Sequence, residues 1–216
     1  MNSARQERLL LEASAGRIEV FLDRLDADQA PRGVALIAHP HPLFGGSAEN
    51  KVVTTIARAL RELGYQTLRP NFRGVGASAG SHDHGIAETE DLLAVHAYAR
   101  SQFPDLPIVL AGYSFGAYVI SRVAQALSGR GDPALRLILI GTATGDVPGA
   151  RSYVTEAVAA DTLIIHGDKD DTVPLVNVLT WAEKQELPVV VVPGADHFFH
   201  RKLHLLRNIV HSAWRN

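Results

Sequence analysis

The sequence contains no cysteine, and this absence removes several kinds of chemistry at once. Without thiols, the chain has no disulfide framework, no cysteine nucleophile and no zinc site built on thiolates. Any covalent acyl transfer that the chain performs must therefore use a different nucleophile, such as a serine hydroxyl.

Neither sign of charge dominates the chain, and long apolar runs are missing. There are 21 Lys and Arg residues against 23 Asp and Glu residues, a formal net charge of −2, and the arginines are scattered along the chain. A nucleic-acid-binding surface normally needs a basic stripe, so we expect no nucleic-acid partner.

No run approaches the roughly 18 apolar residues of a membrane span, and the segment 1–8 lacks the apolar core of a signal peptide. We therefore expect a cytoplasmic protein with no membrane partner.

The remaining composition is ordinary for a globular protein. Hydrophobic residues make up 46% and charged residues 20% of the 216 positions. This length buries a sizeable core without splitting, and no linker-like stretch interrupts it. We expect a single domain over residues 1–216; the sequence leaves open whether the chain is a monomer or a homodimer.

Short strand signals alternate with helix signals along the chain. The strand signals lie at 9–13, 17–23, 33–38, 65–70, 106–111, 135–140, 162–165 and 188–192. The helix signals lie at 48–63, 85–99, 115–129 and 175–186, with one further possible helix near 152–159. The first two strands favour an antiparallel pair at one edge. The later alternation predicts an α/β fold with a doubly wound, mostly parallel sheet and helices on both faces. The connection from 141 to 160 is too short for a cap domain.

One serine stands at the most informative turn of the sequence. The segment 112–116 reads Gly-Tyr-Ser-Phe-Gly, between a buried strand and an apolar helix. A G-x-S-x-G turn in this setting forces the serine into a strained conformation, and the crowding beside it tolerates only glycine. We expect Ser114 to expose its hydroxyl at the carboxyl edge of the sheet and Phe115 N–H to face an oxyanion.

Acidic and imidazole side chains follow two later strands. Asp168, Asp170 and Asp171 follow the strand that ends near 165, and His197 follows the last strand. Reactive groups in such folds gather where parallel strands end. A serine hydroxyl becomes a strong nucleophile when a neutral imidazole takes its proton and a carboxylate orients that imidazole. All three residue types are present in the order Ser, Asp, His.

Five ordered motifs, which span nearly the whole chain, resemble those of the α/β-hydrolases. They are His-Pro-His-Pro-Leu-Phe-Gly-Gly at 39–46, Asn-Phe-Arg-Gly-Val-Gly at 71–76, the 112–116 turn, the 166–174 loop, and Gly-Ala-Asp-His-Phe-Phe at 194–199. In particular the chain is similar to small lidless bacterial serine hydrolases. The resemblance implies that Ser114 is the nucleophile, His197 the general base and then acid, and Asp170 the orienting carboxylate. Asp170 is chosen because related enzymes place their acid three residues after the glycine and three before the valine.

The resemblance also suggests the second oxyanion donor. His39-Pro40 stands where related hydrolases have His-Gly, so His41 N–H is the expected donor and Leu43 N–H the reserve. Prolines 40 and 42 have no amide hydrogen, which leaves few other donors in this loop. The expected substrate-binding side chains are Phe44, Tyr113 and Phe198.

The histidine pairs raise the alternative of a metal site, which we do not favour. His39 and His41 flank a proline in a rigid loop, and His82 and His84 flank Asp83, which is placed to cap the following helix. We expect no metal and no cofactor. The leading functional prediction is a serine hydrolase that cleaves small esters or thioesters through an acyl-enzyme. The alternatives are an acyltransferase or perhydrolase with the same triad, or a catalytically silent binding protein on this fold.

Overall fold

The computed structural model describes residues 6–214, so the ends of the expected 1–216 domain, including the segment 1–5 considered above for a signal peptide, lie outside the described residues. Its main sheet has eight strands in the order β1-β2-β4-β3-β5-β6-β9-β10. These strands are β1 Gln6–Ala13, β2 Gly16–Asp23, β3 Gly33–Ala38, β4 Tyr65–Pro70, β5 Ile108–Tyr113, β6 Arg136–Ile140, β9 Leu163–Gly167 and β10 Val189–Val192. The helices are α1 Lys51–Glu62, α2 Ile86–Gln102, α3 Phe115–Gly129, α4 Leu175–Glu183 and α5 Leu203–Ala213.

The antiparallel part of the sheet is confined to one edge, as predicted. β1 and β2 form a hairpin whose turn contains Gly16 at a φ of +107°, a conformation that glycine adopts at little cost. β2 then pairs antiparallel with β4, and every later pair in the sheet is parallel. Parallel strands end at the same edge of a sheet, so the loops that follow β3, β5, β9 and β10 converge there.

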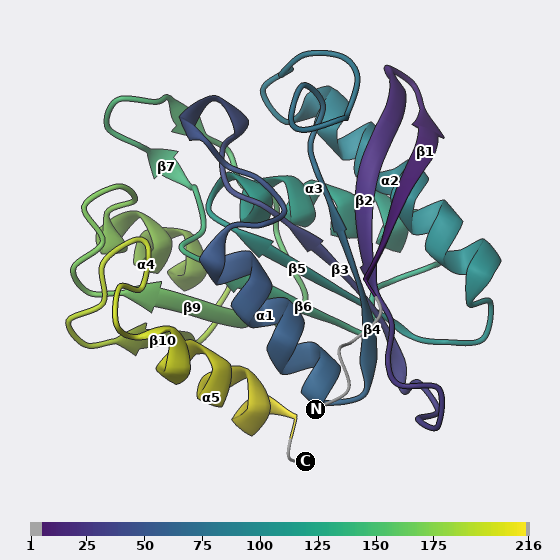
Figure 1. Ribbon diagram of the computed structural model, residues 1–216. Coiled ribbons are helices and arrows are strands. Elements are labelled where there is room, and N and C mark those ends of the chain that lie inside the picture. Colours follow the sequence, from purple (N-terminus) through teal and green to yellow (C-terminus); the bar gives the residue numbers. More distant parts are fainter. Residues whose placement is uncertain (1–5, 215–216) are drawn as a thin grey trace.

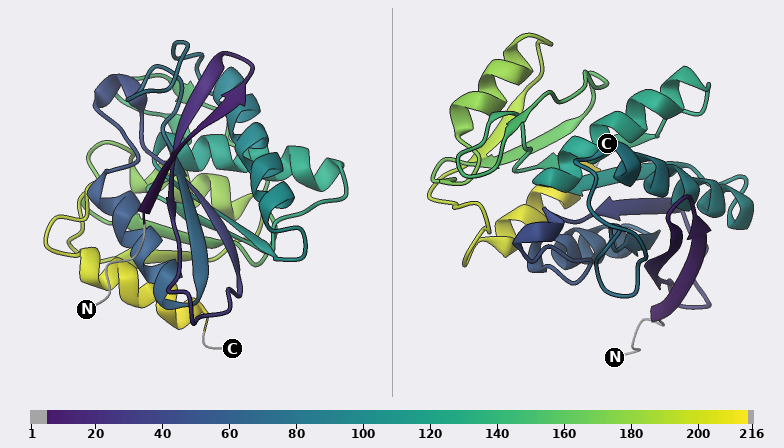
Figure 2. Two further views of the ribbon diagram at one scale, coloured as in Figure 1. Left: turned by 45° about the vertical axis from the view of Figure 1, so that its right-hand side comes forward. Right: turned by 90° about the horizontal axis from the view of Figure 1, so that it is seen from above.

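The helices cover both faces of the sheet (Figures 1 and 2). α1 and α5 lie side by side on one face, where Val52, Ile56 and Leu60 of α1 present an apolar stripe with helical spacing. α2, α3 and α4 pack on the other face. The central strands β3 and β5 are buried along their whole length, which explains their unbroken apolar sequence. The predicted α/β fold is confirmed.

The expected helix near 152–159 is wrong. Ser152–Tyr153 forms strand β8, which pairs with β7, Gly145–Asp146, in a small separate sheet. Long-range contacts override the local helical pattern here. Tyr153 is buried, and Thr155 Oγ1 donates a hydrogen bond of 2.7 Å to the Ala143 carbonyl. This small hairpin therefore occupies the connection between β6 and β9.

Several helix boundaries differ from expectation by three residues: α1 begins at Lys51 instead of 48, and α2 ends at Gln102 instead of 99. α4 ends at Glu183, three residues early, and Glu186 beyond it has a φ of +57° that no helix can contain. α5 begins at Leu203, so it contains His204 but not His200. His200 instead pairs with Asp196 at the surface.

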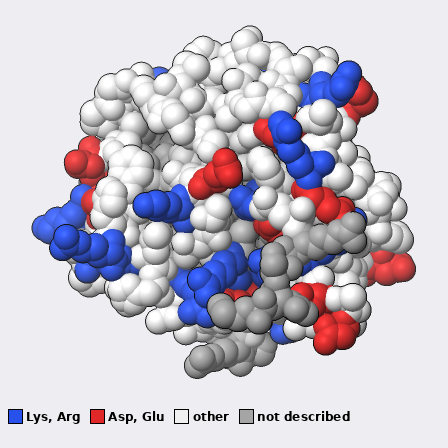
Figure 3. Space-filling model, viewed as in Figure 1, with Lys and Arg blue, Asp and Glu red and all other residues white. Residues whose placement is uncertain are grey.

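The face that carries α1 and α5 shows charges of both signs (Figure 3). Basic and acidic groups are interspersed across its lower part, and the upper part is largely uncharged. Within residues 6–214, no helix combines the length and apolar character needed to cross a bilayer.

Candidate active site

Ser114 lies in the tight turn between β5 and α3. Its backbone has φ 56° and ψ −120°, a conformation that costs a residue with a side chain on the order of 1–3 kcal/mol. The turn is fixed by neighbouring strands: Ser114 N–H donates to the Ile140 carbonyl of β6 at 2.8 Å, and its own carbonyl accepts from Ala143 N–H at 3.3 Å. Such strain persists where the surrounding structure holds it, and here it directs a reactive side chain.

The two glycines of the turn are required by close backbone approach, as predicted. A Cβ on Gly112 would lie 2.5 Å from the Gly116 carbonyl oxygen, and a Cβ on Gly116 would lie 2.4 Å from the His39 carbonyl oxygen. Both distances are far shorter than a carbon–oxygen contact, and both oxygens belong to the backbone, which cannot move aside. The turn can therefore pack against α3 and the loop after β3 only with glycine at both positions.

The structure brings Ser114, His197 and Asp170 into one line of hydrogen bonds. His197 Nε2 lies 3.0 Å from Ser114 Oγ, and His197 Nδ1 lies 2.7 Å from Asp170 Oδ2. Ser114 is 7% exposed and His197 3% exposed, so the line is shielded from bulk water except near the hydroxyl. With Nδ1 donating to the carboxylate, Nε2 is left as the acceptor for the hydroxyl proton.

Of the three aspartates in the loop after β9, Asp170 is the one that contacts His197. Its other oxygen, Oδ1, accepts from Thr172 N–H at 3.0 Å and from Val173 N–H at 2.7 Å. Asp168 instead accepts from Gly194 N–H, and Asp171 is exposed. Two amides on one oxygen fix the plane of the Asp170 carboxylate, and this leaves Oδ2 for the imidazole.

A second buried histidine, which the sequence analysis assigned no role, lies behind Asp170. His166 Nε2 is 3.0 Å from the Val173 carbonyl and 3.4 Å from Asp170 Oδ2. Burial lowers the pKa of His166, which keeps its ring neutral with the proton on Nε2. His166 thus donates toward the loop that carries the acid. The sequence signal was its place immediately before Gly167 in the 166–174 loop.

Tyr113 was expected to contact substrate, and this expectation is wrong. Its side chain is fully buried, and its hydroxyl donates to the His197 carbonyl at 2.9 Å. Its ring centre lies 5.1 Å from that of His197, and burial raises the pKa of the phenol. Tyr113 is the last residue of β5 and packs in the core on the side of α1 and α5, so it supports His197 from within the protein.

The two backbone N–H groups expected to bind the oxyanion, those of Phe115 and His41, make no hydrogen bond within the described residues. Phe115 N–H opens α3. The reserve donor is engaged, because Leu43 N–H donates to His41 Nδ1 at 3.3 Å. Phe115 N–H directly follows the serine, and a free amide there is what a developing oxyanion needs; the role of His41 N–H stays a prediction.

His39 holds the loop that carries His41. Its Nδ1 lies 2.6 Å from the Pro40 carbonyl, and its Nε2 accepts from Phe72 N–H at 2.9 Å. Because an amide donates to Nε2, the proton must be on Nδ1 and the ring must be neutral; burial lowers its pKa to about 3. Both ring nitrogens are thus used within the chain, so His39 has no lone pair for a metal.

Asp83 accepts a hydrogen bond from Ala87 N–H in the first turn of α2 at 3.2 Å, which is the capping role expected for it.

Two of the expected substrate contacts lie at the surface. Phe44 is 69% exposed and its ring centre is 4.7 Å from that of His41. Phe198 is 49% exposed and packs edge-on against His197, with ring centres 5.4 Å apart. Exposed aromatic rings beside His41 and His197 supply apolar surface for a substrate, and both assignments stay predictions.

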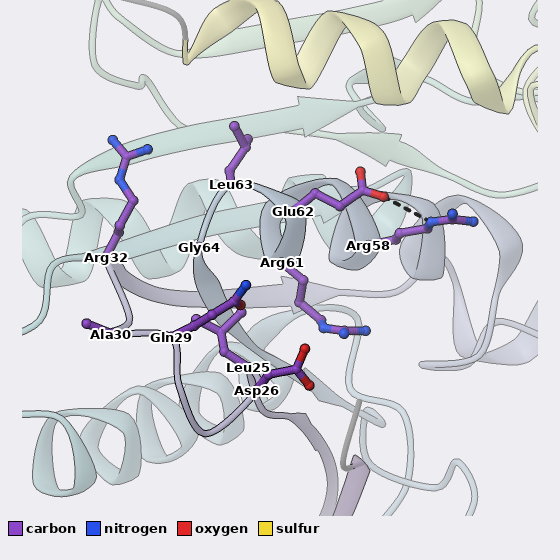
Figure 4. Close-up of a pocket in the computed structure, with 10 residues that line it drawn as sticks. All are labelled: Leu25, Asp26, Gln29, Ala30, Arg32, Arg58, Arg61, Glu62, Leu63 and Gly64. Carbon is purple, nitrogen blue, oxygen red and sulfur yellow. Dashed lines mark hydrogen bonds and ion pairs between the residues drawn. The ribbon is translucent and has the colours of Figure 1, made fainter. Parts of the chain in front are cut away.

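A cavity of about 700 Å³ lies at the other end of the sheet (Figure 4). It is lined by the loop before β3 and the end of α1, including Asp26, Arg32 and Arg61, and by the Arg58–Glu62 ion pair at 3.2 Å. These residues precede the amino ends of β3 and β4, whereas Ser114 follows the carboxyl end of β5. The cavity is therefore separate from the triad.

Comparison with known proteins places this arrangement in a family. A family model described as the alpha/beta hydrolase fold matches residues 41–155, which include the serine turn and His41. The chain belongs to the α/β-hydrolase family. Among solved structures, this α/β-hydrolase is similar to a protein of Xanthomonas campestris described as a serine hydrolase without lid, with 40% identity and a TM-score of 0.86 over 100% of this chain and 96% of that one. It falls in the same lidless group.

Two curated proteins are also similar to this α/β-hydrolase in sequence. An uncharacterized protein of Rickettsia prowazekii is 32% identical over 195 residues, which cover 87% of this chain and 79% of the relative. A monoacylglycerol lipase of Mycolicibacterium smegmatis is 25% identical over 191 residues, which cover 87% of this chain and 64% of the lipase. The similarity to the lipase thus involves about two thirds of that enzyme.

Proposed function

We propose that the protein is a serine hydrolase that cleaves small carboxylic esters through an acyl-enzyme. The observation that carries the proposal is the line of hydrogen bonds from Ser114 through His197 to Asp170, with the free Phe115 N–H directly after the serine. A hydroxyl, an imidazole and a buried carboxylate in this order are the parts that acyl transfer through serine requires.

The first half of the reaction forms the acyl-enzyme. Ser114 Oγ attacks the ester carbonyl carbon while His197 Nε2 takes the hydroxyl proton, and the carbonyl oxygen becomes an oxyanion. Phe115 N–H and His41 N–H stabilise that negative charge. The carbon–oxygen bond to the alcohol then breaks, and His197 returns its proton to the departing alkoxide. Asp170 stays ionised and stabilises the imidazolium throughout.

The second half releases the acid. A water molecule attacks the acyl carbonyl carbon while His197 Nε2 takes one of its protons, and the same two amides hold the second oxyanion. The bond to Ser114 Oγ breaks, the proton passes from His197 to Oγ, and the carboxylic acid leaves. A thioester follows the same steps with a thiol as the leaving group.

Two features favour small esters over other acyl substrates. The curated relative named a monoacylglycerol lipase acts on an ester by its name, and it shares 25% identity with this chain. Between β6 and β9 the chain carries only the short β7–β8 hairpin and irregular segments, so no helical cap encloses a long acyl chain. An uncapped serine favours short acyl groups that need little enclosing surface.

We expect the rate of ester hydrolysis to fall as the acyl chain lengthens. The measurement is kcat/KM for 4-nitrophenyl esters from acetate to palmitate under one set of conditions, with acetate and butyrate fastest. Faster cleavage of the long-chain esters, or a jump in activity at a lipid interface, would contradict the inference that the uncapped serine favours short acyl groups. Adding hydroxylamine or a primary alcohol in the same assay tests the acyltransferase alternative, because an acceptor that takes most of the acyl group at low concentration favours transfer over hydrolysis.

A further inference from the structure

A ring of aromatic and imidazole side chains borders one side of the candidate active site. Phe115, which follows the serine, packs against His41 and His82 with ring centres 4.8 and 5.3 Å apart. His41 and His82 also contact one another at 4.6 Å, and His82 contacts His84 at 4.9 Å. On its other side Phe115 lies 6.4 Å from Tyr153 of the β7–β8 hairpin. We call this cluster of His41, His82, His84, Phe115 and Tyr153 the wall; its residues come from four separate segments of the chain.

Arg151, in the turn between β7 and β8, packs against the tyrosine at the end of this wall. Its guanidinium carbon lies 4.6 Å from the centre of the Tyr153 ring and 5.4 Å from that of Tyr118, and it donates a hydrogen bond to the His84 carbonyl. Tyr118 and Tyr153 both contact Phe115. Arg151 is thus one layer of rings away from the residue whose N–H faces the oxyanion.

No carboxylate within residues 6–214 forms an ion pair with Arg151. Its Nε is buried without a hydrogen-bond partner in the same part of the chain, although a guanidinium has five N–H donors to satisfy. Arg122 differs only in its ion pair: it lies 5.9 Å from the same Tyr118 ring and its Nε is also buried without a hydrogen-bond partner, but it is paired with Glu156 at 3.3 Å. Two arginines therefore flank one tyrosine, and Arg151 is the one without a counter-ion.

The histidines of the wall, and the buried Glu88 beside His82, do not neutralise the positive charge of Arg151. Burial, as the largest cause, lowers the pKa of His41 to about 4 and also lowers that of His82, so both rings are neutral near pH 7. Glu88 is fully buried and lies 2.8 Å from His82, but its oxygens also accept from Asp83 N–H and Gly85 N–H at the start of α2. Its charge faces these amides inside the protein.

We propose that Arg151 binds a carboxylate of the substrate, so that the preferred substrates are esters that carry a carboxylate near the scissile bond. This inference rests on the proposed hydrolase function. A half-buried guanidinium on aromatic rings binds an oxyanion more strongly than a fully hydrated one, because less water must be displaced. His41, which is partly exposed, and His84, which is exposed, contact the neutral part of the same substrate, and the carboxylate fixes the orientation of the ester beside Ser114.

Paired esters test the proposal, because the carboxylate can lie in either half of the substrate. One pair compares 4-nitrophenyl hydrogen succinate with 4-nitrophenyl butyrate, which places the charge in the acyl half. The other compares 4-acetoxybenzoate with methyl 4-acetoxybenzoate, which places it in the alcohol half. In at least one pair we expect the ratio of kcat/KM, anionic over neutral, to fall about tenfold in Arg151→Met. The fall should occur mainly through KM, with Arg151→Lys retaining part of the ratio.

Arg122→Met is the matched control, since it removes the other guanidinium from Tyr118 and should leave both ratios as they are. Succinate as an added inhibitor gives a second readout: it should inhibit the wild type more strongly than Arg151→Met. The proposal is overturned if Arg151→Met, shown by circular dichroism to be folded, leaves both kcat/KM ratios unchanged. It is also overturned if Arg122→Met lowers these ratios as much as Arg151→Met does. Cleavage of the neutral esters in those experiments would keep the hydrolase function intact, whereas no cleavage of any ester would reject that function itself.

Discussion

Ser114→Ala should lower ester hydrolysis by on the order of 10⁶-fold, because the variant retains the two amides and the imidazole but has no nucleophile for them to serve. The folded state should change little. Alanine keeps the Cβ, so the strain at φ 56° is the same, and the lost hydroxyl makes one hydrogen bond, to His197. Losing that bond changes the free energy of unfolding by about 1 kcal/mol. The measurements are kcat with 4-nitrophenyl acetate and the urea midpoint of both proteins.

The urea midpoint shows whether the loss of activity in Ser114→Ala comes from the missing hydroxyl or from unfolding. If Ser114→Ala unfolded at markedly lower urea than the wild type, its inactivity would not identify the nucleophile. If the folded variant kept more than a hundredth of the wild-type kcat, another group would be carrying the reaction, and Ser114 would have to be given up as the nucleophile.

Asp170→Asn should lower kcat by on the order of 10⁴-fold. The reason lies in the two amides that bind Asp170 Oδ1, from Thr172 and Val173. An asparagine here must direct its single oxygen at those donors, which turns its NH₂ group toward His197 Nδ1. The imidazole then accepts at Nδ1 and carries its proton on Nε2, the tautomer that cannot take the proton of Ser114.

The neighbouring aspartates supply matched controls for this prediction. Asp171 is exposed, and Asp168 accepts from Gly194 N–H, so neither contacts His197. We expect Asp171→Asn to change kcat by less than about threefold, as for most surface substitutions, and Asp168→Asn to act mainly on stability through the turn. All three variants are compared by kcat after circular dichroism has verified folding. A crippled Asp171→Asn beside an active Asp170→Asn would mean that the triad acid has been misassigned by one residue.

Local signals in the sequence were enough to predict most of the fold. The apolar runs of β3 and β5, and the glycine-bounded turn at Ser114, are determined by residues close in the chain: full burial demands unbroken apolar sequence, and a crowded turn demands glycine. The meeting of Ser114, Asp170 and His197 followed from topology, because parallel strands end at one edge.

Features that depend on distant contacts could not be predicted in this way. The segment after Ser152 reads as a helix, but Tyr153 packs against Tyr118 and Phe115, contacts that no local pattern encodes. Tyr113 was expected to contact substrate, yet its side chain is fully buried in the core. The sequence likewise gives no sign that Arg151 lacks a counter-ion, since its neighbours in space, such as His84, come from other segments.

Labelling with a fluorophosphonate tests the central claim, an activated serine at position 114, most directly. The reagent reacts with serines whose proton is taken by a base, and it needs no knowledge of the substrate. Intact mass spectrometry should show one adduct per chain, peptide mapping should place it on Ser114, and both His197→Ala and Ser114→Ala should abolish it. Correctly folded protein that stays unlabelled, or that carries the adduct on another serine, would contradict the account and favour a binding protein on a hydrolase fold.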